Sequence, residues 1–133
     1  MSKDRDIRIM VVDDNDIDIV VNTKLLKIAN ITNDVVSLKG YTDLKEYFEA
    51  NKEELLHIST VILMDIQMPE YDGFECIEML QKDFPDVVKK CSMFMLSSSI
   101  DRGDIKRAEE NPEILKVLEK PLDVYQLKRL LEE

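Results

Sequence analysis

Three aspartates follow two short apolar segments of this chain, at positions where their carboxylates could act together. Asp13 and Asp14 come directly after the apolar run 7–12, and Asp65 comes directly after the run 61–64. A single such aspartate is typical of a helix N-cap, as Asp14 or Asp16 would be ahead of Ile17. Three carboxylates at one sheet edge repel one another, so a cation or a proton must relieve them. Few hard oxygen ligands open to solvent suit Mg²⁺, which often bridges to a phosphate.

A hydroxyl and an ammonium group follow two further apolar segments. Ser97 comes directly after the run 93–96, and Lys120 and Pro121 come shortly after the pair 117–118. Each residue alone is an ordinary loop or surface residue. Beside the aspartates, the hydroxyl and the ammonium would donate hydrogen bonds to the oxygens of a phosphoryl group attached to a carboxylate. The set therefore predicts magnesium-assisted phosphoryl chemistry.

Short apolar runs alternate with helical patterns along the chain, and this alternation predicts the elements that carry these residues. The expected buried strands are runs of branched or long apolar side chains, at 7–12, 35–36, 61–64, 93–96 and 117–118. Apolar residues at spacings of three and four predict five helices. We expect the stripe of each helix to face a sheet; the two clearest stripes are Ile17, Val20, Val21, Leu25 and Ile28, and Phe74, Ile77, Leu80 and Phe84.

Strict alternation of strands and helices predicts an α/β fold with a parallel sheet and right-handed crossovers. Five such units fit a flavodoxin-like doubly wound five-stranded parallel sheet in the order 2-1-3-4-5, with five helices on its two faces. Ligands of this fold bind at the carboxyl ends of the strands, where the order reverses between the first and third strands. Asp13, Asp14 and Asp65 are expected to meet at that point.

Composition excludes several other classes of protein. A chain of 133 residues predicts one domain, and a net charge of −10 argues against a phosphate-backbone partner. The start shows no signal peptide and no apolar stretch approaches about 18 residues, so a cytoplasmic protein without membrane insertion is expected. Cys76 and Cys91 lack zinc-site spacing, and the three dispersed glycines form no phosphate-binding loop.

The motifs taken together resemble the receiver domain of two-component response regulators, specifically the stand-alone, chemotaxis-regulator-like kind. The resemblance covers about the whole chain and rests on the order of the motifs, each at an expected strand end. These motifs are the acidic pair Asp13-Asp14, the stretch Asp65-Ile66-Gln67-Met68-Pro69-Glu70-Tyr71-Asp72-Gly73, Ser97, and Lys120-Pro121.

The resemblance implies a role for each of these residues. Asp65 would accept a phosphoryl group, Ser97 and Lys120 would each bind one of its oxygens, and a cis Lys120–Pro121 bond would position the lysine. The cofactor implied is Mg²⁺, with four ligand residues: Asp13, Asp14, Asp65 and Gln67, the last through its backbone carbonyl. The protein would be a signalling phosphoprotein rather than an enzyme, catalysing only its own phosphorylation and dephosphorylation at Asp65.

The implied partners are a sensor histidine kinase or phosphotransfer protein, and a downstream protein target. The single histidine, His57, is expected near the end of the second helix and away from the pocket, so the phosphohistidine must come from another protein. Residues 1–133 are expected to form a single receiver domain with no output domain, and direct nucleic-acid binding is not expected. Phosphorylation would alter the surface that docks protein partners.

One departure from the family pattern leaves an alternative open. Many receivers carry an aromatic residue three positions before the lysine, and here that residue is Val117. The aromatic part of the usual switch is therefore missing. The alternative function is a receiver-like adaptor that binds partners constitutively without phosphorylation. Gln67 and Ser99 occupy the positions that tune the phosphoryl lifetime in the family, with an effect that their side chains alone do not predict.

Two rival site assignments fail on single residues. Asp14, Asp16 and Asp18 have the spacing of the first half of a calcium loop, but Ile19 stands where that loop needs glycine. A phosphohydrolase of the dehalogenase type also uses a strand-end aspartate. It needs a second aspartate two residues later, and here that residue is Gln67.

Overall fold

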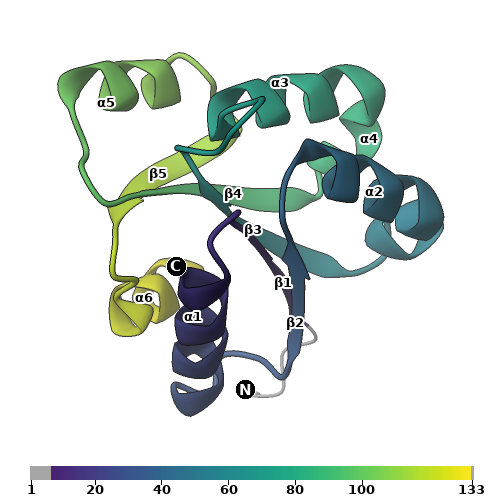
Figure 1. The fold of residues 1–133 in the computed structure, drawn as a ribbon. Coiled ribbons are helices and arrows are strands. Elements are labelled where there is room, and N and C mark those ends of the chain that lie inside the picture. The colour runs from purple at the N-terminus through teal and green to yellow at the C-terminus, as the bar shows by residue number, and fades with distance from the viewer. Residues whose placement is uncertain (1–6, 133) are drawn as a thin grey trace.

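The protein folds around one parallel sheet, seen in a computed structural model that describes residues 7–132. Within that part of the chain the sheet has five strands in the order β2-β1-β3-β4-β5, which confirms the predicted doubly wound topology (Figure 1). The strands are β1 (Ile7–Val12), β2 (Asp34–Leu38), β3 (Ser59–Asp65), β4 (Cys91–Ser97) and β5 (Ile114–Glu119).

Helices cover both faces of the sheet. They are α1 (Asp16–Ile28), α2 (Tyr41–Leu55), α3 (Gly73–Asp83), α4 (Pro85–Val88), α5 (Arg102–Glu109) and α6 (Val124–Leu131). Helices α2 to α5 lie on one face, and α1 and α6 lie side by side on the other (Figure 1). Within residues 7–132, no helix combines the length and the apolar character needed to cross a membrane.

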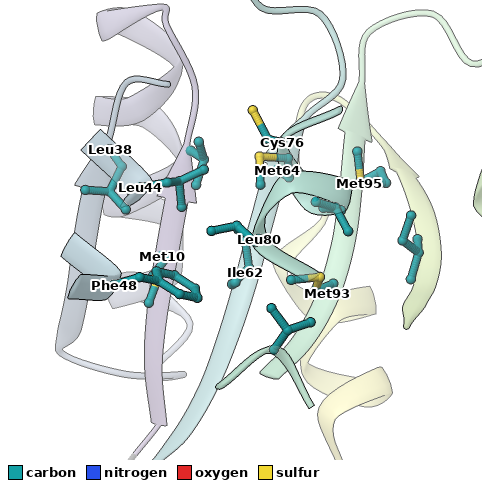
Figure 2. Close-up of a cluster of buried hydrophobic side chains, with 14 of the residues drawn as sticks. Met10, Leu38, Leu44, Phe48, Ile62, Met64, Cys76, Leu80, Met93 and Met95 are labelled. Carbon is teal, nitrogen blue, oxygen red and sulfur yellow. The ribbon is translucent and has the colours of Figure 1, made fainter. Parts of the chain in front are cut away.

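Successive residues of the strands supply two separate cores, as expected of strands buried on both faces. In β1, Met10 and Val12 point to the core beneath α2 and α3, whereas Ile9 and Val11 point to the core beneath α1 and α6. Figure 2 shows the first core, in which Met10 lies beside the ring of Phe48. This two-sided burial holds the central strands rigidly and so holds the residues at their ends.

The structure contains six helices among the described residues, one more than the five predicted. We expected Phe84 to extend the α3 stripe, but Phe84 ends that helix with the non-helical backbone angles φ −135° and ψ 54°. The cause is Pro85, because a proline disfavours helical geometry at the residue before it. Proline suits the first position of a helix, and Pro85 opens the short helix α4.

The buried face of α1 is also different from the one predicted. The stripe expected to face the sheet is largely in solvent: Ile17 is 73% exposed and Ile28 is 71% exposed. The sheet instead receives Ile19 and Leu26, which belong to the core beneath α1 and α6. Helix α1 has apolar residues around most of its circumference, so spacing alone did not distinguish the face that packs from the face that remains exposed.

Candidate functional site

The three predicted carboxylates meet at the carboxyl edge of the sheet. Asp65 is the last residue of β3, and Asp13 follows β1, its neighbour in the sheet. Asp13, Asp14 and Asp65 each offer an oxygen within 4.8 Å of the others. Asp13 is 1% exposed and Asp65 is 5% exposed, whereas Asp14 is open to solvent. This donor set fits Mg²⁺, because it offers carboxylate oxygens on one side and leaves room for water on the other.

Local hydrogen bonds fix the direction of the chain at this edge. The carboxylate of Asp13 accepts a 2.9 Å hydrogen bond from the N–H of Asn15. Asn15 is the N-cap of α1, and its side chain accepts from the N–H groups of Ile17 and Asp18. The cap is therefore Asn15 rather than Asp14 or Asp16, which leaves those two carboxylates outside the cap.

The loop after Asp65 depends on a close approach between Gly73 and that residue. The N–H of Gly73 donates to the carbonyl of Ile66 over 2.9 Å. A Cβ added to Gly73 would collide with the carbonyl oxygen of Asp65 and would lie 2.9 Å from Cγ of Met64. Only glycine fits there without displacement, so the glycine of the Asp-Gly pair keeps α3 close to the end of β3.

Lys120 reaches into the same pocket from the end of β5. Its ammonium Nζ lies 2.8 Å from Oδ2 of Asp13, 3.0 Å from Oδ2 of Asp18 and 3.2 Å from Oδ1 of Asp65. The Lys120–Pro121 peptide bond is cis, as predicted. Burial lowers the pKa of Lys120, but the hydrogen bonds to Asp13 and Asp18 outweigh it, so the pKa is raised overall. The lysine stays charged and partly neutralises the acidic pocket.

The pKa of Asp65 is raised to about 6. Burial is the main cause, and the negative charge of Asp13 adds to it. The ammonium of Lys120 and a backbone hydrogen bond from Gln67 act in the opposite direction and favour the ionised carboxylate. At neutral pH Asp65 is therefore mostly ionised, although it lies in a pocket that resists further negative charge.

Gln67 lies beside the pocket through its backbone hydrogen bond to Asp65, and Ser97 lies at the end of the neighbouring strand β4. Ser97 is buried at the end of β4, and its hydroxyl donates to the carbonyl of Ser99 over 3.0 Å and accepts from the N–H of Ser99 over 3.1 Å. Its carbonyl accepts a 2.8 Å hydrogen bond from the N–H of Lys120. The hydroxyl is thus engaged with its own loop, while the backbone of Ser97 connects β4 to the lysine.

The position predicted for His57 agrees with the structure. His57 is exposed and precedes β3, so it lies at the amino edge of the sheet, opposite the pocket. Cys76 and Cys91 are both free thiols. Val117, at the position that is aromatic in many receivers, is half-buried and packs against the core beneath α2 and α3.

Asp18 also lies in the pocket, although the sequence did not predict it there. We weighed it only as part of a calcium loop, yet its carboxylate is a direct partner of Lys120. The available signal was its place in the first turn of the helix that follows Asp13 and Asp14. Side chains in the first turn of a helix tilt toward the loop that precedes the helix, which brings Asp18 near the pocket. Its partner Lys120 comes from the end of β5, so the local sequence does not identify that contact.

Comparison with known proteins gives one consistent family. Residues 9–132 match the response regulator receiver domain family. A response regulator receiver protein from Dyadobacter fermentans is 33% identical, with 95% of each chain covered and a TM-score of 0.78. A two-component response regulator from Cytophaga hutchinsonii shares the fold at 24% identity, with 96% of each chain covered and a TM-score of 0.87.

Proposed function

Because this chain belongs to the response regulator receiver domain family, we propose that Asp65 accepts a phosphoryl group from a phosphohistidine of a sensor histidine kinase or phosphotransfer protein. The observation that carries the proposal is the convergence of Asp13, Asp14 and Asp65 with Lys120 at one sheet edge. An oxygen of Asp65 would form the new bond to phosphorus while the bond between phosphorus and the histidine nitrogen breaks. The electron pair of that bond stays on the histidine nitrogen, and with the other ring nitrogen protonated the donor leaves as neutral imidazole. The product on this chain is an acyl phosphate on Asp65.

The acidic residues around Asp65 would bind the metal, and the ammonium and hydroxyl groups would bind the phosphoryl oxygens. Asp13, Asp14, Asp65 and the backbone carbonyl of Gln67 would hold Mg²⁺. Bound Mg²⁺ would supply positive charge against the oxygens of the transferred group. Lys120 would bind one phosphoryl oxygen with its ammonium, and Ser97 would bind another with its hydroxyl. Ser97 must first withdraw the hydrogen bond that its hydroxyl donates to the carbonyl of Ser99, which links phosphorylation to the loop that leads into α5.

A second connection between the pocket and α5 supports a change at the surface that docks protein partners. Arg107 of α5 lies 3.1 Å from Oδ2 of Asp72, the N-cap of α3, and its guanidinium lies 4.3 Å from the centre of the Phe74 ring. An ion pair therefore joins α5 to the end of the loop that follows Asp65, and a cation–π contact joins α5 to the first turn of α3. A shift of that loop would reach α5 without an aromatic residue at Val117.

The exposed apolar residues of α1 supply a docking surface for the phosphohistidine partner. We name this surface the α1 apolar face, formed by Ile17, Val20, Val21 and Ile28. It begins at the pocket, because α1 starts two residues after Asp14. A partner seated there would bury the apolar side chains and bring its histidine next to Asp65.

Labelling with a small phosphodonor tests the phosphoacceptor proposal. The protein is incubated with acetyl phosphate and MgCl₂, and the intact mass is measured. One added phosphoryl group is expected, absent without Mg²⁺ and absent in Asp65→Asn. No mass shift, or labelling that survives Asp65→Asn, would contradict the proposal and favour a constitutive adaptor.

A further inference from the structure

The ammonium of Lys120 has three acidic partners, and one of them has no assigned role in the proposed reaction. Asp13 and Asp65 belong to the proposed metal set, whereas Asp18 comes from the first turn of α1 and lies 3.0 Å from Nζ of Lys120. An ammonium group has three hydrogens to donate. Two of them are donated to Asp13 and Asp18, and the ammonium also forms a 3.2 Å ion pair with Asp65.

A phosphoryl group on Asp65 would turn that carboxylate into an acyl phosphate, so phosphoryl oxygens would replace the contact between Asp65 and the ammonium. To donate to more than one of these oxygens, Lys120 must also release Asp13 or Asp18. The side chain of Asp13 is 1% exposed, so water cannot replace its contact with the ammonium. The side chain of Asp18 is 39% exposed, so water can solvate its carboxylate once the contact is lost. Loss of the contact with Asp18 therefore costs less free energy than loss of the contact with Asp13.

We propose that Asp18 is a positioning residue that competes with the phosphoryl group for Lys120. This inference rests on the proposed function of Asp65. Before transfer, Asp18 holds the ammonium at the mouth of the pocket, on the side of α1. After transfer, the phosphoryl oxygen takes its place, and the lost ion pair lowers the stability of the phosphorylated state. Removing the charge of Asp18 should therefore strengthen binding of a phosphoryl mimic.

The experiment measures the affinity of the protein for beryllofluoride, a tetrahedral phosphoryl mimic, with saturating MgCl₂ at 0.15 M salt. Asp18→Asn should bind about two- to five-fold more tightly than the wild type, the range expected for loss of a partly exposed competing ion pair. Asp18→Glu restores the carboxylate and should return the affinity to within about two-fold of the wild type. Titration by ¹⁹F NMR gives each affinity directly.

A matched control separates the contact from net charge. Asp16 is on the same helical turn, but its carboxylate pairs with Lys39 at 2.7 Å and its side chain is 73% exposed. Asp16→Asn removes the same charge and should leave the affinity within about two-fold of the wild type. An equal gain in Asp16→Asn and Asp18→Asn would overturn the inference, because net charge alone would then explain both.

A second readout needs neither metal nor mimic. In the metal-free protein, the ammonium hydrogens of Lys120 should exchange with water faster in Asp18→Asn than in the wild type or Asp18→Glu. Unchanged exchange, or unchanged or weaker beryllofluoride binding in Asp18→Asn, would contradict the role of Asp18 while leaving the proposed function intact. Failure of the wild type to bind beryllofluoride would overturn the proposed function, and this inference with it.

Discussion

Nζ of Lys120 lies 3.2 Å from Oδ1 of Asp65, so an ion pair joins the ends of β5 and β3 across the intervening strand β4. Both side chains are largely buried, at 14% and 7% exposure. An ion pair in this position is weakly screened by solvent, and loss of one partner leaves the other charge poorly compensated. Among residues 7–132, Lys120 is the only side-chain cation that forms an ion pair with Asp65.

Replacement of Lys120 should slow phosphorylation strongly. In Lys120→Met, the acidic pocket loses its ammonium and repels an incoming phosphoryl group, so the initial labelling rate with acetyl phosphate should fall by at least about ten-fold. Intact-mass time courses give the rate. Lys116→Met removes an exposed lysine from the same strand and serves as the control. Equal rates in Lys120→Met and the wild type would contradict the role of the lysine.

The raised pKa of Asp65 predicts a pH dependence of stability. Its folded pKa of about 6 lies above its ordinary value of 3.8, so the folded state binds the proton more tightly than the unfolded state. The contribution of Asp65 to stability therefore falls as pH rises from about 4 to about 6 and stays low above that range. At neutral pH without metal, Asp65→Asn should be more stable than the wild type, by at most about 3 kcal/mol.

Urea unfolding in EDTA between pH 4 and pH 7 measures this difference. The difference in unfolding free energy between Asp65→Asn and the wild type should widen as pH rises toward 6, because only the wild type has Asp65 to ionise. The titrating groups common to both proteins cancel in this difference. A gap that is constant across the range would show that Asp65 does not titrate as expected.

Magnesium should stabilise the folded protein through the three carboxylates. A ligand that binds only the folded state adds about 1.4 kcal/mol when its free concentration is ten times its Kd. Thermal unfolding with and without MgCl₂ should show this gain in the wild type and lose most of it in Asp13→Asn. Asp86→Asn, an exposed carboxylate of α4, should keep the full gain. Equal stabilisation of Asp13→Asn and the wild type would refute the proposed metal site.

The close approach of Gly73 to Asp65 predicts a specific cost for a single methyl group. Gly73→Ala forces the new Cβ against the carbonyl oxygen of Asp65 and against Met64, so it should lower the free energy of unfolding by about 1–3 kcal/mol and slow labelling. Gly40→Ala is the matched control, because no atom lies within 4 Å of its added Cβ. Chemical denaturation compares the two variants, and similar stabilities would contradict the packing argument.

The α1 apolar face predicts a separation between two phosphodonors. Val20→Glu places a charge at its middle, where a docked protein would have to desolvate it. Transfer from a phosphorylated histidine kinase domain should fall about ten-fold or more, while labelling by acetyl phosphate should remain near the wild-type rate. Ala50→Glu adds the same charge at an exposed position of α2, on the opposite face of the sheet, and is the control. An equal loss with both phosphodonors would place the defect in the pocket rather than at a docking surface.

The order of strands, the sheet edge and the positions of Asp13, Asp14, Asp65 and Lys120 followed from the sequence. Buried parallel strands are recognisable as short apolar runs, and the doubly wound topology sends their carboxyl ends to one edge. Residues that directly follow those runs must therefore lie near one another. The local pattern was sufficient to predict the topology, because the parallel direction of the strands and the right-handed connections leave few possible strand orders.

The tertiary structure decided the features that depend on which surfaces meet. Helix α1 is apolar on more than one side, so only its contact with the sheet shows that Ile19 and Leu26 are buried and Ile17 is exposed. The contact between Asp18 and Lys120 joins residues 102 positions apart, and no local periodicity encodes it. Helical and strand patterns are set by neighbouring residues, whereas ion pairs and buried faces are set by the packing of elements distant in sequence.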